Sequence, residues 1–134
     1  MTEMDLMQRA RDMLPFAYAP YSGFSVGAAL EAEDGRVFTG CNVENAAYGS
    51  SICAERTALL KAVSEGARSF RRIAVIGSGK ELCQPCGACR QMLSEFAPDL
   101  EVLVGSAQSE KMEKVSLADL LPYRFGPSHV KREK

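Results

Sequence analysis

The spacing of apolar and polar positions in the first third of the chain predicts a helix followed by a β-hairpin. Residues 4–14 carry apolar side chains along one helix face, and Thr2 followed by Asp5 resembles a capping box at its start. Residues 24–32 are small and apolar, as in a buried strand. An acidic, glycine-containing turn then leads into residues 37–43, which we expect to return as an antiparallel strand.

The rest of the chain alternates between helix and strand. Ala54, Ala58 and Ala62 recur at four-residue spacing, which predicts a helix that ends at Gly66. The continuous apolar run 73–76 suits a strand that is covered on both faces. The remaining predicted segments are a polar loop at 44–51, a helix at 86–96, a short buried strand at 101–105, a capped helical turn at 116–121 and an irregular tail from Pro122.

These elements predict a single domain that covers residues 1–134. Their order is hairpin, helix, strand, helix, strand, which indicates an α/β sandwich around a mixed sheet. The sequence contains no internal repeat and no domain linker. Its 46% apolar and 25% charged residues match an ordinary globular protein.

Charge and hydropathy narrow the classes of partner. The 16 Lys and Arg residues against 17 Asp and Glu residues give a net charge of −1, which argues against nucleic acid or an anionic membrane. The basic cluster at 131–134 is interpreted as a solvated tail. No apolar run approaches the roughly 18 residues of a membrane span. Because the acidic N-terminus does not resemble a secretory signal, we expect a cytoplasmic protein with reduced thiols.

Three of the five cysteines stand at predicted helix starts, where the partial positive charge of the helix favours the thiolate. Two residues separate Cys86 from Cys89, which is the usual spacing for two ligands on one Zn²⁺ ion. Cys53 could reach the same ion if the two helices pack side by side. Three protein ligands would leave one position of tetrahedral zinc open, as in a catalytic site.

Glu55 lies two residues after Cys53, on the same first helical turn. A carboxylate there could face the open position and move protons without binding the metal. Each piece alone also fits a structural role, since first-turn glutamates often only interact with the helix dipole. The combination of Cys53 and Glu55, a gap of about thirty residues and then the run from Pro85 to Cys89 is far more specific. It is the signature of zinc deaminases that act on nucleobases, in its three-cysteine form.

On these motifs the sequence resembles the small homotetrameric cytidine deaminases over nearly its whole length. The matching segments are residues 17–22, 24–30, 40–48, 53–58, 85–91 and 120–122, together with Phe125. The resemblance implies a three-layer α/β/α sandwich around a mixed sheet, and a homotetramer whose active sites are shared between subunits. It also implies hydrolysis of cytidine and 2′-deoxycytidine to uridine and 2′-deoxyuridine with release of ammonia, a reaction of pyrimidine salvage.

The resemblance further implies roles for individual residues. Cys53, Cys86 and Cys89 would bind one Zn²⁺ per subunit, and Glu55 would shuttle protons. The nucleoside contacts would be Asn42 and Glu44 to the ribose, the Ala54 backbone N–H to the pyrimidine carbonyl, Phe24 from the same subunit, and Ala46, Tyr48 and Phe125 reaching a neighbouring subunit's site.

Two residues beside these motifs need separate treatment. The family usually has Ser or Thr at the position of Gln84 and uses the backbone carbonyl there, so we do not count Gln84 as catalytic. Arg56 matters because of the charge of the metal site. The charges of one Zn²⁺ ion and three thiolates sum to −1, and a negative site would make zinc-bound water a poorer acid. Arg56 is predicted to offset that charge by hydrogen bonding to the thiolate sulfurs, with a surface salt bridge as its alternative role.

The residues by themselves leave other functions open. Cys86 and Cys89 also resemble a thiol–disulfide redox pair, although that reading leaves Cys53 and Glu55 unexplained. A structural zinc module would need a fourth ligand, which Cys83 could supply. A zinc deaminase could also act on another cytosine-containing compound such as blasticidin S. A nucleic-acid-editing enzyme would need a basic channel, which the net charge does not support.

Overall fold

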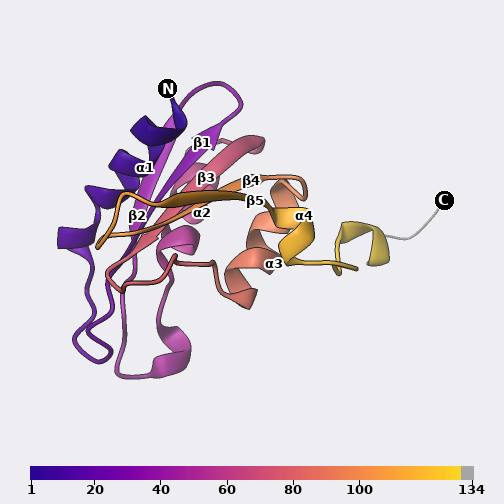
Figure 1. Cartoon of the computed structure of the whole chain (residues 1–134). Coiled ribbons are helices and arrows are strands. Elements are labelled where there is room, and N and C mark those ends of the chain that lie inside the picture. Colours follow the sequence, from indigo (N-terminus) through magenta and orange to yellow (C-terminus); the bar gives the residue numbers. More distant parts are fainter. Residues whose placement is uncertain (131–134) are drawn as a thin grey trace.

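The computed structural model describes residues 1–130 and contains a five-stranded sheet (Figure 1). Its strands are β1 (Val26–Ala32), β2 (Val37–Cys41), β3 (Phe70–Gly77), β4 (Glu101–Ser106) and β5 (Met112–Ser116), in the order β2-β1-β3-β4-β5. β3 and β4 pair in parallel, whereas the other neighbouring pairs are antiparallel. The predicted mixed sheet with an antiparallel hairpin is confirmed.

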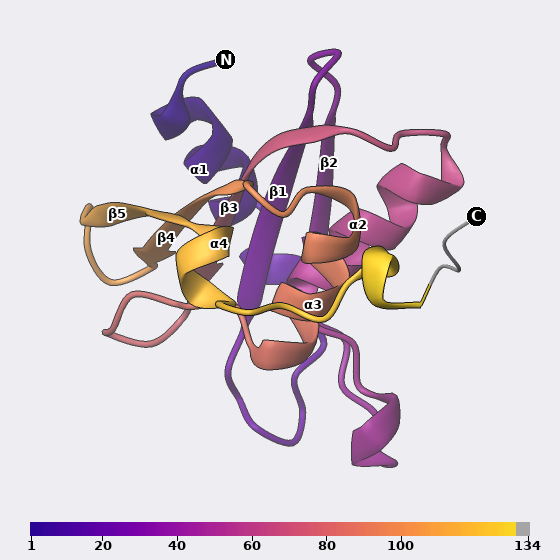
Figure 2. The same cartoon turned by 90° about the vertical axis from the view of Figure 1, so that its right-hand side faces the viewer.

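Helices cover both faces of the sheet, which gives the three layers that the resemblance implied (Figure 2). α1 (Glu3–Arg11) packs on one face, and α2 (Ala54–Ser64) and α3 (Gly87–Phe96) pack on the other. The short α4 (Leu117–Leu120) follows β5. Thr2 and Asp5 form the expected capping box, and Ser116 accepts a hydrogen bond from the first turn of α4.

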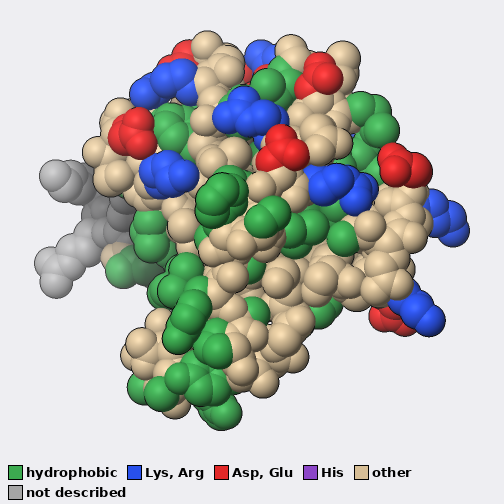
Figure 3. Space-filling model, turned by 90° about the vertical axis from the view of Figure 1, so that its left-hand side faces the viewer, with side chains coloured by type: hydrophobic (Ala, Val, Ile, Leu, Met, Phe, Trp, Pro, Cys, Tyr) green, Lys and Arg blue, Asp and Glu red, His purple; other side chains and the backbone are tan. Residues whose placement is uncertain are grey.

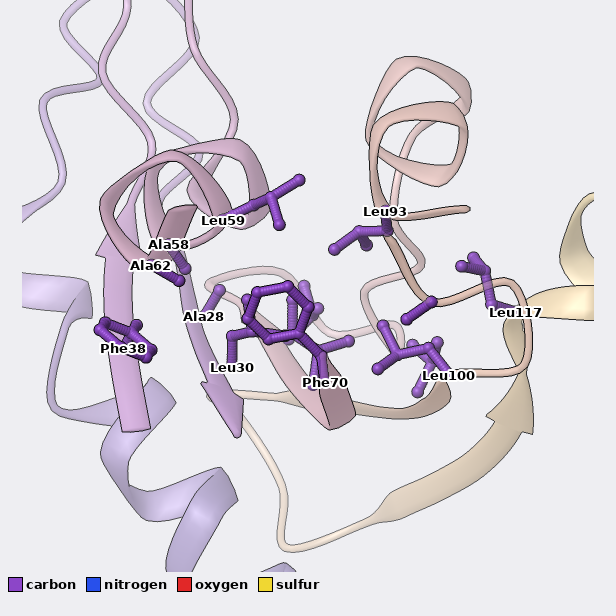
Figure 4. Packing of buried hydrophobic residues seen from close by; sticks show 14 of the residues in the cluster. Ala28, Leu30, Phe38, Ala58, Leu59, Ala62, Phe70, Leu93, Leu100 and Leu117 are labelled. Atoms are coloured by element: carbon purple, nitrogen blue, oxygen red, sulfur yellow. The ribbon is translucent and has the colours of Figure 1, made fainter. Parts of the chain in front are cut away.

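Strand residues alternate between two apolar cores because successive side chains of a strand point to opposite faces. Ala28 and Leu30 of β1 belong to the core beneath α2 and α3, which Figure 4 shows. Ala29, between them, packs under α1. β3 divides in the same way, and this explains why residues 73–76 are continuously apolar.

α2 lies very close to β2 at Gly40. A Cβ atom at this position would come within 2.5 Å of the Ala54 carbonyl oxygen and 2.6 Å of the Ala58 nitrogen. Both are backbone atoms, so only a residue without a side chain permits the approach. Gly40 therefore sets the first turn of α2, and the residues around Cys53, directly against the sheet.

Some boundaries differ from the sequence prediction. α1 ends at Arg11, and Leu14–Phe16 forms a separate 3₁₀ turn around Pro15, because helices usually end before the residue that precedes a proline. β2 ends at Cys41, after which Val43 makes only isolated bridges. β5 was not predicted, since this edge strand is largely exposed and its sequence shows no clear alternation of apolar and polar residues.

The surface bears on the predictions about partners. Within residues 1–130, no helix combines the length and hydropathy that crossing a membrane requires. On the face shown in Figure 3, Lys and Arg side chains are interspersed with Asp and Glu rather than forming a basic stripe. The predicted basic tail at 131–134 lies outside the described residues.

Candidate active site

The three cysteines predicted to bind metal lie together where α2 and α3 begin. Cys53 is the residue before α2, Cys86 is the residue before α3, and Cys89 lies in the first turn of α3. The Sγ atoms of Cys53 and Cys86 are 3.5 Å apart, and those of Cys86 and Cys89 are 3.4 Å apart. All three Sγ atoms lie within 4.8 Å of one another. The side-by-side arrangement of the two helix starts, on which the prediction depended, is confirmed.

This group of three sulfurs fits a tetrahedral Zn²⁺ ion. With Zn–S bonds of about 2.3 Å, ligand sulfurs stand about 3.8 Å apart, close to the separations found here. Contact with Cys89 and the nearby Arg56 guanidinium lower the pKa of the Cys53 thiol, and the contact with Cys53 raises the pKa of the Cys89 thiol. Of these two residues, Cys53 is therefore favoured as the thiolate, which is the form that binds metal.

Glu55 is the second residue of α2, and only 4% of it is exposed. Burial removes water from the carboxylate and raises its pKa to about 7, against the opposing effect of its own backbone N–H. Glu55 lines the same cavity as Cys53 and Cys86. A carboxyl group that titrates near neutral pH can both accept and donate a proton during a reaction.

The cavity in front of the cysteines has a volume of about 480 Å³, which is in the usual range for small-molecule sites. Its wall contains the contacts predicted from the same subunit, namely Phe24, Asn42, Glu44 and Ala54. Tyr48, which was predicted to reach a neighbouring subunit's site, lines the cavity of its own subunit. The structure therefore places the apolar and polar residues expected to contact a nucleoside in the same cavity as Cys53 and Cys86.

Asn42 and Glu44 form the polar side of this cavity and are held by the loop before β1. The Asn42 side chain accepts a hydrogen bond from the Val26 N–H and donates one to the Phe24 carbonyl, both at 2.8 Å. The Ser22 hydroxyl donates to the Glu44 carboxylate and lowers its pKa below the ordinary value. Glu44 is thus an anionic acceptor at neutral pH.

Arg56 places its guanidinium beside the sulfurs. Its Nη2 atom donates to the Ser51 carbonyl at 3.1 Å and lies 3.6 Å from the Cys53 Sγ atom. The Nε atom is buried and has no hydrogen-bond partner among the described residues. The position brings a fixed positive charge to the thiolates, as the sequence predicted.

Two predicted contacts lie away from the cavity of the same subunit. Ala46 is exposed in the loop after β2 and does not line the cavity. Phe125 is 62% exposed, and its ring stacks on His129 with 5.3 Å between ring centres. Because both residues are expected at a neighbouring subunit's site, their roles stay predictions.

The cavity also contains Ser22, Ser51 and Gln84, to which the sequence gave no functional role, and Cys83, which the sequence offered as a possible fourth zinc ligand. Among the described residues, the group that could hold a metal comprises Cys53, Cys86 and Cys89 without Cys83. Burial raises the pKa of the Cys83 thiol to about 12, which also disfavours the thiolate. The geometry therefore gives no support to Cys83 as a fourth ligand.

Ser22 lies in the segment 17–22, which resembles the family, and this resemblance is the feature of the sequence that could have identified Ser22 as part of the site.

Comparison with protein families supports the same chemistry. A family model described as "Cytidine and deoxycytidylate deaminase zinc-binding region" matches residues 1–105. The chain is 49% identical over 109 residues to the cytidine deaminase of Sporosarcina psychrophila, covering 81% of this chain and 80% of that protein. It is 50% identical over 110 residues to the cytidine deaminase of Halalkalibacterium halodurans, covering 81% of this chain and 83% of that protein.

Solved structures resemble the whole fold. A crystal structure of cytidine deaminase from Burkholderia pseudomallei has a TM-score of 0.89 at 49% identity, covering 93% of this chain and 100% of that chain. A crystal structure of cytidine deaminase from Mycobacterium tuberculosis has a TM-score of 0.81 at 37% identity, covering 94% and 99% of the two chains. The sheet order and the layers described above are thus shared with proteins of this type.

Proposed function

The chain belongs to the cytidine and deoxycytidylate deaminase family, and from that premise we propose that it is a zinc-dependent cytidine deaminase. It hydrolyses cytidine and 2′-deoxycytidine to uridine and 2′-deoxyuridine and releases ammonia. The observation that carries this conclusion is the group of Cys53, Cys86 and Cys89 beside the buried Glu55, in one cavity. When bound by these cysteines, zinc would act as a Lewis acid that lowers the pKa of a bound water molecule toward neutral pH.

Binding and orientation of the nucleoside fall to the wall of the cavity. Glu44 accepts a hydrogen bond from a ribose hydroxyl, the Asn42 side-chain amide also bonds to the ribose, and Phe24 packs against the nucleoside. The Ala54 backbone N–H, at the free N-terminus of α2, donates to the pyrimidine carbonyl. These contacts place C4 of the cytosine ring, which carries the amino group, toward the cysteines and Glu55.

Glu55 moves the protons of the reaction. As the oxygen of water bonds to C4, Glu55 accepts the proton that water loses and delivers it to N3 of the ring. Glu55 then takes the remaining hydroxyl proton and passes it to the amino nitrogen, so that the C4–N bond breaks and ammonia leaves. The products are a C4 carbonyl and an unchanged carboxyl group. A pKa of about 7 suits both directions of transfer.

The assembly and cellular setting are proposals of the same kind. The single domain forms a homotetramer in the cytoplasm, where it serves pyrimidine salvage. Each active site receives Ala46 and Phe125 from a neighbouring subunit, while Tyr48 lines the cavity of its own subunit and is exposed enough to contact a neighbour as well. Tyr48 and Phe125 are 75% and 62% exposed although both are large aromatic residues. Figure 3 also shows hydrophobic side chains gathered on the protruding lower part of one face. Exposed apolar patches of this kind are typical of protein interfaces.

Uridine and ammonia release from cytidine by the purified, zinc-loaded protein tests the function. Glu55→Ala should lower kcat by roughly a hundredfold to ten-thousandfold, because general acid–base catalysis contributes rate factors of that order. Glu65→Ala, at the exposed C-terminal end of the same helix, serves as the matched control and should retain full activity. Turnover that persists in Glu55→Ala would remove Glu55 from the proton path. If the wild type does not act on cytidine, cytosine-bearing antibiotics such as blasticidin S become the next substrates to assay.

A further inference from the structure

Ser22 lies at the centre of a group of hydrogen bonds in the loop that precedes β1. Its hydroxyl donates to Oε2 of Glu44 and accepts a hydrogen bond from the Phe24 N–H at 3.0 Å. The backbone N–H groups of Tyr21 and Ser22 donate to Oε1 of Glu44 at 3.0 and 3.1 Å. A single hydroxyl oxygen therefore joins Glu44 to the backbone of Phe24.

The number of acceptor sites on Glu44 limits what it can still bind. An ionised carboxylate has about four acceptor sites, two on each oxygen. The two backbone donors occupy Oε1, and the Ser22 hydroxyl occupies one site of Oε2. One acceptor site on Oε2 is left, which is enough for one hydroxyl donor from a ligand in the cavity that Glu44 lines.

The local backbone is shaped for this arrangement. Gly23 has a φ of +69°, in the left-handed region, and the chain turns there so that the Ser22 hydroxyl meets the N–H of Phe24 two residues later. On the far side of Phe24, the Ser25 N–H donates to the Ser78 hydroxyl at 3.0 Å. The loop is thus held at the residue that follows β3 by a bond that does not involve Ser22. The hydrogen bonds of the Ser22 side chain therefore concern only Glu44 and Phe24, which line the cavity.

We propose that Ser22 is a positioning residue that holds the Glu44 carboxylate and the Phe24 backbone in the arrangement that receives the sugar of the nucleoside. The inference rests on the proposed function, which assigns Glu44 and Phe24 to the nucleoside. Ser22 itself needs no contact with substrate. By its bond to Oε2, Ser22 leaves one acceptor site on the Glu44 carboxylate, so Glu44 binds a single sugar hydroxyl. By its bond to the Phe24 N–H, Ser22 also fixes the position of Phe24 relative to Glu44.

Steady-state kinetics of the zinc-loaded enzyme test the proposal. Ser22→Ala should raise KM for cytidine about tenfold and leave kcat within about twofold, because substrate binding must then also order the Glu44 carboxylate and the Phe24 backbone, and Ser22 touches no reacting atom. Ser22→Thr, which keeps the hydroxyl, should recover most of the affinity. Ser78→Ala removes the hydroxyl that bonds to Ser25 from the end of β3. It should leave KM unchanged, because the Ser78 N–H still donates to the Ser25 carbonyl at 2.9 Å.

A second readout reports on Glu44 directly. Carbon-13 NMR of the glutamate side chains should show that Ser22→Ala raises the pKa of Glu44 toward its ordinary value, because the Ser22 hydroxyl is the main cause of its lowering. Thermal unfolding should move by no more than a few degrees, since Ser22 is exposed. An unchanged KM or an unchanged Glu44 pKa in Ser22→Ala would overturn the inference alone, as would a large loss of stability. Absence of cytidine turnover in the wild type would instead reject the proposed function, and this inference with it.

Discussion

At the scale of single residues, we expect Arg56 to balance the charge of the metal site. Three thiolates outweigh the charge of one Zn²⁺ ion by one unit, so the site would be a weak Lewis acid without a nearby cation. The Nη2 atom of Arg56 lies 3.6 Å from the Cys53 Sγ atom, and its buried Nε atom has no hydrogen-bond partner among the described residues. The sequence suggested this contact because Arg56 directly follows Glu55 and because the charges of one Zn²⁺ ion and three thiolates sum to −1.

Replacing Arg56 by Gln should therefore shift the acidic limb of the pH–kcat profile to higher pH or speed the loss of zinc to a chelator. Both effects follow from removal of a positive charge beside the thiolates. Kinetics across pH and zinc analysis during dialysis measure them. Arg68→Gln, whose exposed side chain bonds only to carbonyls at the end of α2, is the matched control. An Arg56→Gln protein with the wild-type profile and zinc content would show that Arg56 has only a surface role.

At the scale of elements, the contact between β2 and α2 sets the position of the site. Cys53 immediately precedes α2 and Glu55 lies in its first turn, and Gly40 is the point at which that helix meets the sheet. No helical or strand periodicity marks Gly40 as special. Its meaning becomes visible only when the backbone atoms of Ala54 and Ala58 are found 2.5 and 2.6 Å from where a Cβ atom would stand.

Gly40→Ala should lower stability by about 1–3 kcal/mol, as overpacking of a tight core does, and should lower zinc content together with activity. The methyl group would meet backbone atoms of α2, so the helix must move and take Cys53 with it. Urea unfolding, zinc analysis and kcat are the measurements. Gly49→Ala, where nothing lies within 4 Å of the added atom, is the control. Normal zinc content and activity in Gly40→Ala would mean that the first turn of α2 tolerates displacement.

At the scale of the whole molecule, the exposed aromatic residues point to a site completed by another subunit. Phe125 packs beside α3 through a hydrogen bond from Gln91 to its carbonyl, which leaves its ring on the surface. The cavity of the same subunit contains no part of Phe125. This exposure agrees with the proposal that a neighbouring subunit covers the ring.

Phe125→Ala should raise KM for cytidine about tenfold or more, because a buried aromatic contact is worth at least 1.4 kcal/mol. Co-assembly provides the sharper measurement. Glu55→Ala subunits carry a normal Phe125, so mixing them with Phe125→Ala subunits should return sites with intact Glu55 to a normal KM. Sedimentation should give a mass four times that of the chain. A monomer, or no recovery in mixed assemblies, would contradict the shared site.

The sequence alone determined the alternation of helices and strands, the chemistry of Cys53, Glu55, Cys86 and Cys89, and the family. These features are local, since they depend on periodicity within one element or on residue types at fixed short spacing. The sequence implied that Cys53 lies near Cys86 and Cys89 only through the known zinc deaminase motif, and not through the pattern of either helix. The edge strand β5 was not predicted, because none of its residues is buried and its sequence therefore shows no clear alternation of apolar and polar residues.

Only the tertiary structure decided the features that join distant parts of the chain. It brought Cys53 within 3.5 Å of Cys86, it excluded Cys83 from the sulfur group, and it joined Ser22 to Glu44. Burial of Glu55, which moves its pKa to about 7, likewise depends on what packs around it. Desolvation and contacts across the sheet are properties of the packed chain, and no short stretch of sequence contains them.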